Sequence, residues 1–479
     1  MAITSASGID AAPRKQTLAS NYVDFTSSAT EGWAQQYLPD LMEKEAEVYG
    51  KRTIAGFLAQ VGAEEPSAAD RVIWSEQGRL HLAYTAKYVS GNNKYEIEND
   101  IDGNDVGTTP GLRVGDMVIM SLANATAKGY VSAVDPDGDN GAEFTVLSYG
   151  AANMATALGS TATTSELIRV LVIGSEFEKG SGARTAANAP KFKSHSNKHI
   201  ILRDYYEVSG SDASAIGWVE ISGEEGQNGY LWYLKAEGDT RARFADYLEM
   251  TMLEAETAVD GAGAIGGTDQ STSDGTQGLF QAITTRGHQT TGITGVNAAT
   301  DLAEFDAILA VFDANGAIEE NMMFVDRTTS LAIDDMLASM NTYGAGGTSY
   351  GVFENDEDMA LNLGFSGFRR GSYDFYKSDF KYLNDKGTRG GLNDTVNNIR
   401  GGVIPAGVSS VYDEQLGRNM KRPFLHVRFR ASETESRKMK TWVTGSVGAA
   451  TSGIDSMQVH YLSERCLITQ GANNFMLMN

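Results

Sequence analysis

The chain has 479 residues, with 62 acidic side chains against 39 Lys and Arg, a formal net charge of −23 and a single cysteine. At about 100–200 residues per domain this length predicts roughly two to four domains, and the 41% apolar content can bury a sizeable core, which excludes global disorder. One cysteine cannot form an intramolecular disulfide, and so acidic a surface repels phosphate, which argues against general nucleic-acid binding.

Features of targeting segments and of enzymes are scarce. Residues 1–20 lack the apolar stretch of a signal peptide, and no window approaches the roughly 18 consecutive apolar residues of a membrane span. These observations predict a soluble chain of cytoplasmic origin. The 6 histidines are few for an enzyme of this size, whereas 53 glycines against 8 prolines indicate many turns and extended segments.

The first part of the chain predicts an arm and then helical segments. Residues 1–30 are small and polar with isolated apolar side chains, and we interpret them as an extended arm that is either disordered or laid across another surface. Apolar residues in 31–49 recur on one helical face, and Pro39 predicts a kink or two short helices there.

Short strands dominate the next region. Residues 71–90 predict a hairpin, because two apolar runs flank the polar residues 75–79. Residues 98–178 are rich in Asp, Gly, Ala and Val, and Asp135–Asp139 has the composition of a turn. Strands are predicted here at 116–121, 128–134, 143–148 and 167–173. Strands this short and close predict a small β-barrel inserted in a longer extended segment.

A locally basic strip follows at residues 179–203. Its cations are Lys179, Arg184, Lys191, Lys193, Lys198 and Arg203. In so acidic a chain, this strip is either a solvated loop or a surface that docks on an acidic patch of a partner subunit.

The strongest helical pattern spans residues 229–259. Phe244, Leu248 and Met252 follow steps of four, and the glycines after Asp260 end the helix. Gly238 weakens its first part. A helix of about 31 residues would be roughly 45 Å long, which suits a spine better than a compact enzyme core.

The second half of the chain mixes helices and strands. A helix is predicted at 301–313, a buried strand at 322–326, and then a second helix capped by Asp326 or Thr328, before a Gly-rich loop at 341–371. Further strands are predicted at 372–383, 403–412, 424–431, 456–462 and 465–470. This order predicts an α+β fold.

The best candidate for a metal site is the acidic segment Asp135, Asp137 and Asp139, whose spacing matches the start of a calcium loop. Asn140 and Val146 stand where that loop needs Gly and Glu, so an acidic turn is the alternative. Asp100–Asn104 fails in the same way.

The remaining candidates are isolated. His195 and His199 have the spacing of zinc ligands on a helix, but their surroundings show no helical pattern. Cys466 is predicted to be a buried small hydrophobe. Glu224-Glu225 and Asp334-Asp335 are typical of surfaces or caps, although a glycosidase pair is set by space and stays open. The sequence has no phosphate loop or nucleophile elbow, so we predict no catalytic, cofactor or metal site.

The order of elements resembles the major capsid protein of tailed double-stranded DNA bacteriophages, the Hong Kong 97-type capsid fold. The closest local similarity lies in residues 240–340. There a spine-like helix ends in Glu256–Gly263, Gly275–Phe280 resembles the opening of the family's peripheral domain, and Met322–Asp326 resembles its axial strand. Ser372–Asp379 is similar to a late axial-domain strand.

This resemblance implies a division of the chain. It implies an N-terminal arm at 1–66, an extended hairpin loop at 67–205 that includes the β-rich insertion 98–178, a peripheral domain at 206–299 and 441–479 with spine helix 229–259, and an axial domain at 300–440. The insertion departs from the minimal family pattern. A charged coiled-coil prosegment is not seen before the arm, so separate scaffolding is expected.

The resemblance also implies a structural role without enzymatic activity. Copies would self-assemble into pentamers and hexamers of an icosahedral shell, in the host bacterial cytoplasm, and would remain in the virion capsid around DNA that is not bound specifically. Acidic charge toward the lumen would keep the DNA from adhering. The implied partners are scaffolding, portal and auxiliary or decoration proteins, with no membrane and no cofactor.

Two other classes of protein remain open. One is a different virion component or an encapsulin-like shell protein. The other is a β-rich hydrolase or adhesin, which would need an export route that the N-terminus does not show. Some relatives cross-link Lys to Asn covalently, and the sequence offers several candidates for such a bond.

Overall fold

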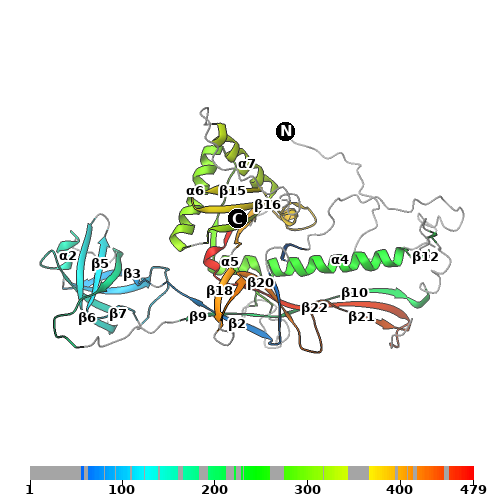
Figure 1. Ribbon diagram of the computed structural model, residues 1–479, viewed down its shortest axis with the longest axis horizontal. Coiled ribbons are helices and arrows are strands. Elements are labelled where there is room, and N and C mark those ends of the chain that lie inside the picture. The colour runs from blue at the N-terminus through cyan, green and yellow to red at the C-terminus, as the bar shows by residue number, and fades with distance from the viewer. Residues whose placement is uncertain are drawn as a thin grey trace. The chain divides into compact units, whose positions relative to one another are not determined.

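The computed structural model is drawn in Figure 1. It describes residues 56–58, 63–79, 81–91, 93–107, 110–122, 125–138, 141–159, 166–182, 192–211, 221–222, 228–229, 231–258, 275–316, 318–342, 366–393, 398–406, 408–413, 418–446 and 452–479. Two compact units are present, one made of Ser75–His195 and the other of the rest of the chain. Both mix strands with helices, so the predicted α+β class is confirmed. Among the described helices, none has the length and apolar content needed to cross a membrane.

The Ser75–His195 unit is a closed barrel of six strands. In barrel order these are β3 (Ala83–Ser90), β4 (Lys94–Asp100), β7 (Gly141–Ser148), β6 (Ala125–Gly138), β5 (Asp116–Leu122) and β8 (Ile168–Ser175). A short helix, α2 (Met154–Ala157), begins where the side chain of Asn153 accepts a hydrogen bond from the backbone of Thr156. The predicted barrel is thus confirmed, with β3 and most of β4 preceding residue 98.

The barrel forms because its strands alternate between inward apolar and outward polar side chains. On β5, Val118 and Met120 are buried while Met117 and Ile119 are only partly buried. Large rings such as Tyr95 and Phe144 fill the interior together with aliphatic side chains from all six strands. This filling is typical of small barrels, whose interior is a packed core.

Two local predictions in this region are wrong. Residues 71–90 do not form a hairpin, because β2 (Arg71–Gln77) pairs with β9 (Phe192–Lys198), whereas β3 pairs with β4 and β8. Asp135 and Asp137 do not form a turn, because β6 continues through them to Gly138 against β7. In both cases pairing with a strand from elsewhere in the fold overrides the local turn composition.

The larger unit contains a long sheet in the order β1 (Ala63–Ser67), β20 (Leu425–Arg430), β22 (Ser456–Thr469) and β10 (Ile200–Ser209). β21 (Lys440–Gly445) also pairs with β22. β22 is one continuous strand, so the prediction of two strands at 456–462 and 465–470 is wrong. Polar Ser463 does not interrupt it, because its hydroxyl donates to the carbonyl oxygen of Lys438 at 2.6 Å.

The same unit contains a sheet of six strands. Their order is β13 (His288–Thr290), β23 (Met476–Met478), β17 (Gly401–Pro405), β14 (Glu320–Val325), β16 (Tyr373–Asp379) and β15 (Ser366–Arg370). Helices α6 (Ala298–Asn315) and α7 (Arg327–Thr342) share an apolar core with it. Asp326 caps the start of α7, because its carboxylate accepts from the backbone N–H of Thr329, so the structure selects the first of the two predicted caps.

Smaller elements correct several predicted boundaries. The strand predicted at 372–383 ends at Asp379 and is followed by α9 (Lys381–Asn384) and the 3₁₀ turn η3 (Arg389–Gly391). The strand predicted at 403–412 is two strands, β17 and β18 (Val408–Asp413), which belong to different sheets. The remaining paired strands are β18 (Val408–Asp413) with β19 (Arg418–Pro423), and β11 (Ile221–Ser222) with β12 (Asn228–Gly229).

The predicted spine helix is α4 (Leu231–Glu254), about 36 Å long at 1.5 Å per residue. It ends five residues earlier than predicted, because the chain turns where the N–H of Gly278 donates to the carbonyl of Ala255. α5 (Leu279–Arg286) follows, and η4 (Ala472–Asn474) lies near the C-terminus. The predictions for 1–30, 31–49 and most of 341–371 fall outside the described residues.

Candidate functional site

The long helix α4 lies against one face of the long sheet (Figure 1). Phe244 and Leu248 of the helix form an apolar cluster with Val459 and Tyr461 of β22. The two helix residues are four apart and the two strand residues are two apart, so each pair lies on one face of its element. β22 is 14 residues long, or about 46 Å at 3.3 Å per residue, and α4 contacts both β22 and its neighbour β10.

The opposite face of the same strands carries an aromatic ladder, formed by Tyr205, His460 and Trp442. These residues lie directly opposite one another on β10, β22 and β21. The Tyr205 and His460 rings stack with centroids 5.9 Å apart, and those of Trp442 and His460 at 5.1 Å. The Lys440 ammonium lies 5.9 Å from the Trp442 ring centroid, within cation–π range. Tyr205 is half exposed, so the ladder presents an aromatic surface to solvent.

The segment Gly56–Leu58 is anchored where the long sheet, α4 and the six-stranded sheet share a core. The two carboxylate oxygens of Glu249 on α4 accept from the backbone N–H groups of Gly56, at 3.1 Å, and Leu58, at 3.2 Å. Burial raises the pKa of Glu249, and these two N–H donors oppose that shift. The Phe57 ring packs edge-on against Phe324, with centroids 4.6 Å apart. Residues that precede β1 are therefore held by both charge and packing.

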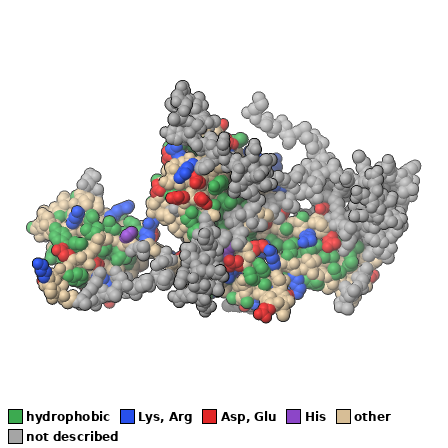
Figure 2. All heavy atoms as spheres, viewed as in Figure 1, with side chains coloured by type: hydrophobic (Ala, Val, Ile, Leu, Met, Phe, Trp, Pro, Cys, Tyr) green, Lys and Arg blue, Asp and Glu red, His purple; other side chains and the backbone are tan. Residues whose placement is uncertain are grey.

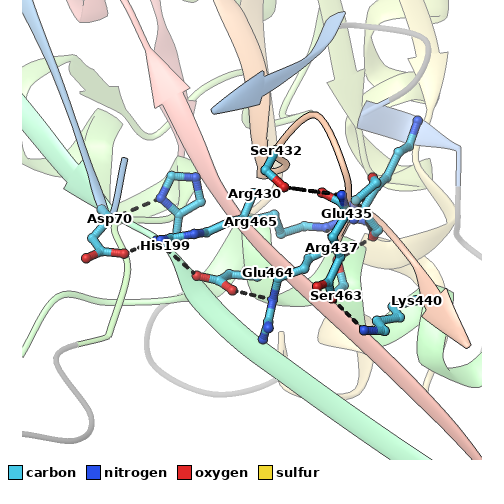
Figure 3. A network of polar contacts seen from close by, with 12 residues as sticks. Asp70, His199, Arg430, Ser432, Glu435, Arg437, Lys440, Ser463, Glu464 and Arg465 are labelled. Carbon is cyan, nitrogen blue, oxygen red and sulfur yellow. Dashed lines mark hydrogen bonds and ion pairs between the residues drawn. The ribbon is translucent and has the colours of Figure 1, made fainter. Parts of the chain in front are cut away.

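Ion pairs then fasten β1 and the residues after it to the C-terminal half of the chain, and Figure 3 shows the part of this network around Asp70, Arg430 and Glu464. Glu65 pairs with Arg428 at 2.8 Å, Asp70 pairs with Arg430, and Glu64 pairs with Lys438. A parallel ladder between β1 and β20 reinforces them. Because every pair joins segments more than 350 residues apart, none of these partners could be chosen from the sequence.

Arg465 and Glu464, adjacent on β22, are the buried centre of this network. The guanidinium of Arg465 donates to the hydroxyl of Ser463 at 2.9 Å and to the carbonyl of Lys438 at 3.0 Å. Burial lowers the pKa of Arg465, while Glu64 and Glu249 raise it. On the other face of the strand, Glu464 pairs with Arg437 at 2.6 Å. Buried charges held by several partners fix the register of the strands around them.

The two histidines singled out as possible metal ligands lie in different surroundings. His195 Nε2 lies 3.6 Å from the carboxylate of Glu76. His199 Nδ1 lies 3.1 Å from the carbonyl oxygen of Asp70, and its Nε2 lies 3.7 Å from the sulfur of Cys466. Among the described residues, no three His, Cys, Asp or Glu side chains gather as a metal site would require.

Cys466 is fully buried beside Trp74 and Ile468, as predicted. Burial raises the pKa of its thiol to about 12, so the thiol stays protonated at neutral pH. A protonated, inaccessible thiol is a poor nucleophile. In this site Cys466 acts as a small packing residue and His199 as its polar neighbour.

The acidic candidates also have local structural roles. Asp100 caps a turn, since its Oδ1 accepts from the backbone N–H groups of Asp102, at 2.9 Å, and Asn104, at 2.8 Å. Asp135 and Asp137 lie exposed on β6, and Asp139 is outside the described residues. Asp334 forms an ion pair with Lys377. Glu224 and Glu225 are outside the described residues.

The basic strip at 179–203 is divided among separate elements. Lys179 follows the barrel strand β8, Lys193 and Lys198 lie on β9, and Arg203 lies on β10. Lys193 and Arg203 are exposed, whereas Lys198 is partly buried. Arg184 and Lys191 are outside the described residues. The docking interpretation of this strip stays a prediction.

Sequence reasoning missed Glu249, Arg465 and the aromatic ladder. Each residue depends on partners that are distant in the chain, and a single sequence gives no signal for such pairs. Together, the buried charges of the site hold extended segments of the chain in place, and the aromatic ladder exposes apolar surface.

No family model and no curated protein matches the sequence. Among solved structures, the chain is similar to one from Mycobacterium phage Ogopogo, at 12% identity over 93% of this chain and 97% of that one, with a TM-score of 0.39. A capsid structure of the cyanophage P-SCSP1u matches at 10% identity over 95% and 96% of the two chains, with a TM-score of 0.38. The capsid of Myoviridae phage XM1 matches at 10% identity over 91% and 96%, with a TM-score of 0.36. One of these three solved structures is from a phage, and the other two are capsids of phages.

Proposed function

We propose that this chain is a major capsid protein of the Hong Kong 97 type, a structural subunit that self-assembles into pentamers and hexamers of an icosahedral shell around phage double-stranded DNA. The observation that carries the proposal is the exposed apolar surface on its long elements. Tyr205 and Ile201 on β10, Val443 on β21, and several barrel residues are large, apolar and about half exposed. Exposed apolar patches of this kind mark protein–protein contacts.

The anchored N-terminal segment supports the same proposal. Glu249 and Phe57 fix the chain at residues 56–58, so an arm formed by residues 1–55 would start from the same place in every copy. In a closed symmetric assembly each arm then meets an identical neighbouring surface. The ordering cost of a long arm is offset in this way by contacts between copies.

The domain division follows from this proposal. Residues 1–66 serve as the arm and 67–205 as the extended loop, whose insertion includes the barrel. Residues 206–299 and 441–479, with α4, serve as the peripheral domain, and 300–440 as the axial domain. The subunit has no catalytic role, and its partners are other copies together with scaffolding, portal and decoration proteins.

The net charge of −23 supports a shell that encloses DNA without binding it. Acidic side chains toward the lumen would repel the phosphates of packaged DNA, which keeps the genome mobile for ejection. Assembly takes place in the host bacterial cytoplasm and the product remains in the virion.

The experiment is to purify the full chain and to measure particle mass by multi-angle light scattering and particle shape by negative-stain electron microscopy. We expect closed shells in the megadalton range, or pentamers and hexamers that assemble into them. A stable monomer or dimer would contradict the proposal, and helical tubes would indicate a tail component. Shells that fill with a cargo protein in place of DNA would indicate an encapsulin-like compartment.

A matched pair of variants connects this assay to the aromatic ladder. Tyr205→Asp places a charge on the half-exposed ladder, whereas Thr284→Asp places the same charge on an exposed position of α5. We expect Tyr205→Asp to reduce shell yield at least tenfold and Thr284→Asp to leave it close to wild type. Circular dichroism verifies that both variants fold.

A further inference from the structure

The barrel has two very different outer walls. On the wall formed by β3 and β4, the outward side chains are polar and charged, among them Thr85, Lys87, Glu96 and Glu98, and Lys87 pairs with Glu98. On β5 and β8 most outward side chains are apolar, and Tyr130 on β6 and Leu147 on β7 add to this apolar wall among polar neighbours. A barrel that contacts water on all sides does not need an apolar outer wall, so the apolar wall requires an explanation.

The register places the apolar side chains of this wall in adjoining rows. One row runs from Leu147 on β7 through Tyr130 on β6 to Met117 on β5. The next joins Ile119 on β5 to Leu171 on β8. Leu147 is 49% exposed and Leu171 is 41% exposed. Hydrophobic side chains are also visible on the barrel unit in Figure 2.

Two aromatic residues and Ile173 extend the patch. Tyr149 is exposed, and its hydroxyl donates to the carboxylate of Glu176, just beyond the end of β8. The ring of Phe177 lies beside Gly115, 3.1 Å from where a Cβ would stand, and is half exposed. We define the barrel patch as Met117, Ile119, Tyr130, Leu147, Tyr149, Leu171, Ile173 and Phe177.

Charges of opposite sign lie at the two ends of the barrel patch. At one end Arg169 on β8 is exposed opposite Ser121. At the other end lies Glu176, also exposed. The two are seven residues apart along an extended strand, which is about 23 Å at 3.3 Å per residue. The patch therefore has Arg169 at one end and Glu176 at the other, and one further cation, the exposed Lys128 on β6, lies opposite Ile119 within it.

We propose that the barrel patch packs on the same patch of a second copy of this chain, around a twofold axis through its centre. Such an axis brings Arg169 of each copy to Glu176 of the other, so the surface is complementary to itself in charge as well as in polarity. A different partner would need no such internal symmetry. The inference deepens the proposed function, on which it rests, by naming the contact that the insertion makes between subunits.

Charge reversal on the full chain tests the proposal. Arg169→Glu leaves two acidic ends and Glu176→Arg leaves two basic ends, so each single variant opposes like charges across the axis. The double variant Arg169→Glu/Glu176→Arg restores two opposite pairs with reversed polarity. Rescue by the double variant is expected only if the partner surface carries the same substitutions, that is, if it belongs to another copy.

The readout is a disulfide between copies. Leu171→Cys places a thiol near the proposed axis, while Cys466 is buried. Glu96→Cys on β4, on the opposite wall, is the matched control. After mild oxidation of the assembled protein, we expect Leu171→Cys to give covalent dimers on a non-reducing gel, at least fivefold fewer in either single-reversal background, and recovery in the double variant. Mixing the two single-reversal proteins should also restore the dimers.

Three results would overturn the inference. They are equal cross-linking of the Glu96→Cys control, no loss of dimers in the single variants, and a double variant that is no better than either single one. Shells that form without the disulfide leave the proposed function standing and reject the barrel contact. Disulfide dimers without shells retain the barrel contact and reject the shell. Because all the substituted side chains are at least partly exposed, circular dichroism is expected to report folded variants in each case.

Discussion

The barrel and the long sheet both bury extended strands, but each does so in a different way. All six barrel strands come from residues 83–175, and the barrel closes on itself around Tyr95 and Phe144. The long sheet instead joins β1 near the start of the described chain to β20, with Ala63 opposite His426. The barrel is therefore local in sequence and the sheet is non-local, which decides how each should respond to damage.

This difference explains how a barrel can be inserted in the chain. The chain leaves the larger unit within β2 and returns within β9, and these two strands pair with each other. The strands that lead into and out of the insertion are thus adjacent. Residues inserted between them therefore leave the strand pairing of the larger unit unchanged. Insertions are tolerated where the two ends of the inserted segment lie close together.

The largest expected effect comes from emptying the barrel core. Phe144→Ala removes a ring that is 1% exposed and should lower the unfolding free energy of the barrel by about 3–5 kcal/mol. Because the barrel is a separate unit, hydrogen exchange should accelerate in β3–β8 while β22 and β10 keep their protection. Phe305→Ala, in the core below the six-stranded sheet, is the matched control and should spare the barrel. Loss of protection throughout the chain after Phe144→Ala would contradict the independence of the two units.

The next effect concerns the anchored segment of the larger unit. Glu249→Ala leaves the N–H groups of Gly56 and Leu58 without their acceptor, and we expect a cost of about 2–3 kcal/mol. Limited proteolysis should then cut faster near residues 56–58, with the barrel unaffected. Glu249→Gln keeps one acceptor oxygen and should give an intermediate rate. Equal proteolysis of wild type and Glu249→Ala would show that Phe57 alone holds the segment.

A pair of glycines sharpens the comparison further. Gly129 lies in the barrel, where an added Cβ would meet the side chains of Met154 and Val146 and lie 2.7 Å from the carbonyl oxygen of Leu147. Gly129→Ala should therefore destabilise the barrel by about 1–3 kcal/mol. Gly238 is exposed in α4 and an added Cβ meets nothing within 4 Å, so Gly238→Ala should stabilise by about 0.5–1 kcal/mol. Thermal unfolding of both variants measures whether each substitution lowers or raises stability. A stability change of the same sign in both variants would contradict this interpretation.

The smallest effect is a pH dependence in the larger unit. Burial lowers the pKa of His199 and of His288 below the usual value of 6.5. In the unfolded chain these imidazoles bind a proton more readily than in the folded one, so stability is full above pH 6.5 and falls as the pH drops below it. Melting temperatures at pH 7.5 and 5.5 should differ less in His199→Asn than in wild type. An unchanged difference would show that His199 does not contribute.

Local patterns in the sequence predicted the helices and strands that bury one face, because burial of one face imposes a regular spacing of apolar residues. α6 and α7 lie where apolar residues recur at helical spacing, and α4 was found through Phe244, Leu248 and Met252. β5 to β8 were found as short strands at close spacing, although the turn predicted at Asp135–Asp139 was wrong. These patterns are local because each element must bury one side of itself, whatever its partner is.

The sequence did not predict which strands pair with each other or which groups the buried charges contact. The hairpin predicted at 71–90 is wrong because β2 takes β9 as its partner and β3 takes β4 and β8. The break predicted within β22 is wrong because Ser463 finds the carbonyl of Lys438. In the candidate site, Glu249 and Arg465 gave no signal, because a charge in a strand or a helix becomes informative only once its partner is known.

The sequence by itself determined the class of fold, the location and buried face of the main helices, the existence of a barrel and the burial of Cys466, since all of these depend on composition and on short-range periodicity. Only the tertiary structure decided which strands share a sheet, which charges are buried and which apolar side chains stay exposed. Pairing and burial depend on contacts between residues far apart in the chain, and the free energy of such contacts belongs to the folded arrangement as a whole.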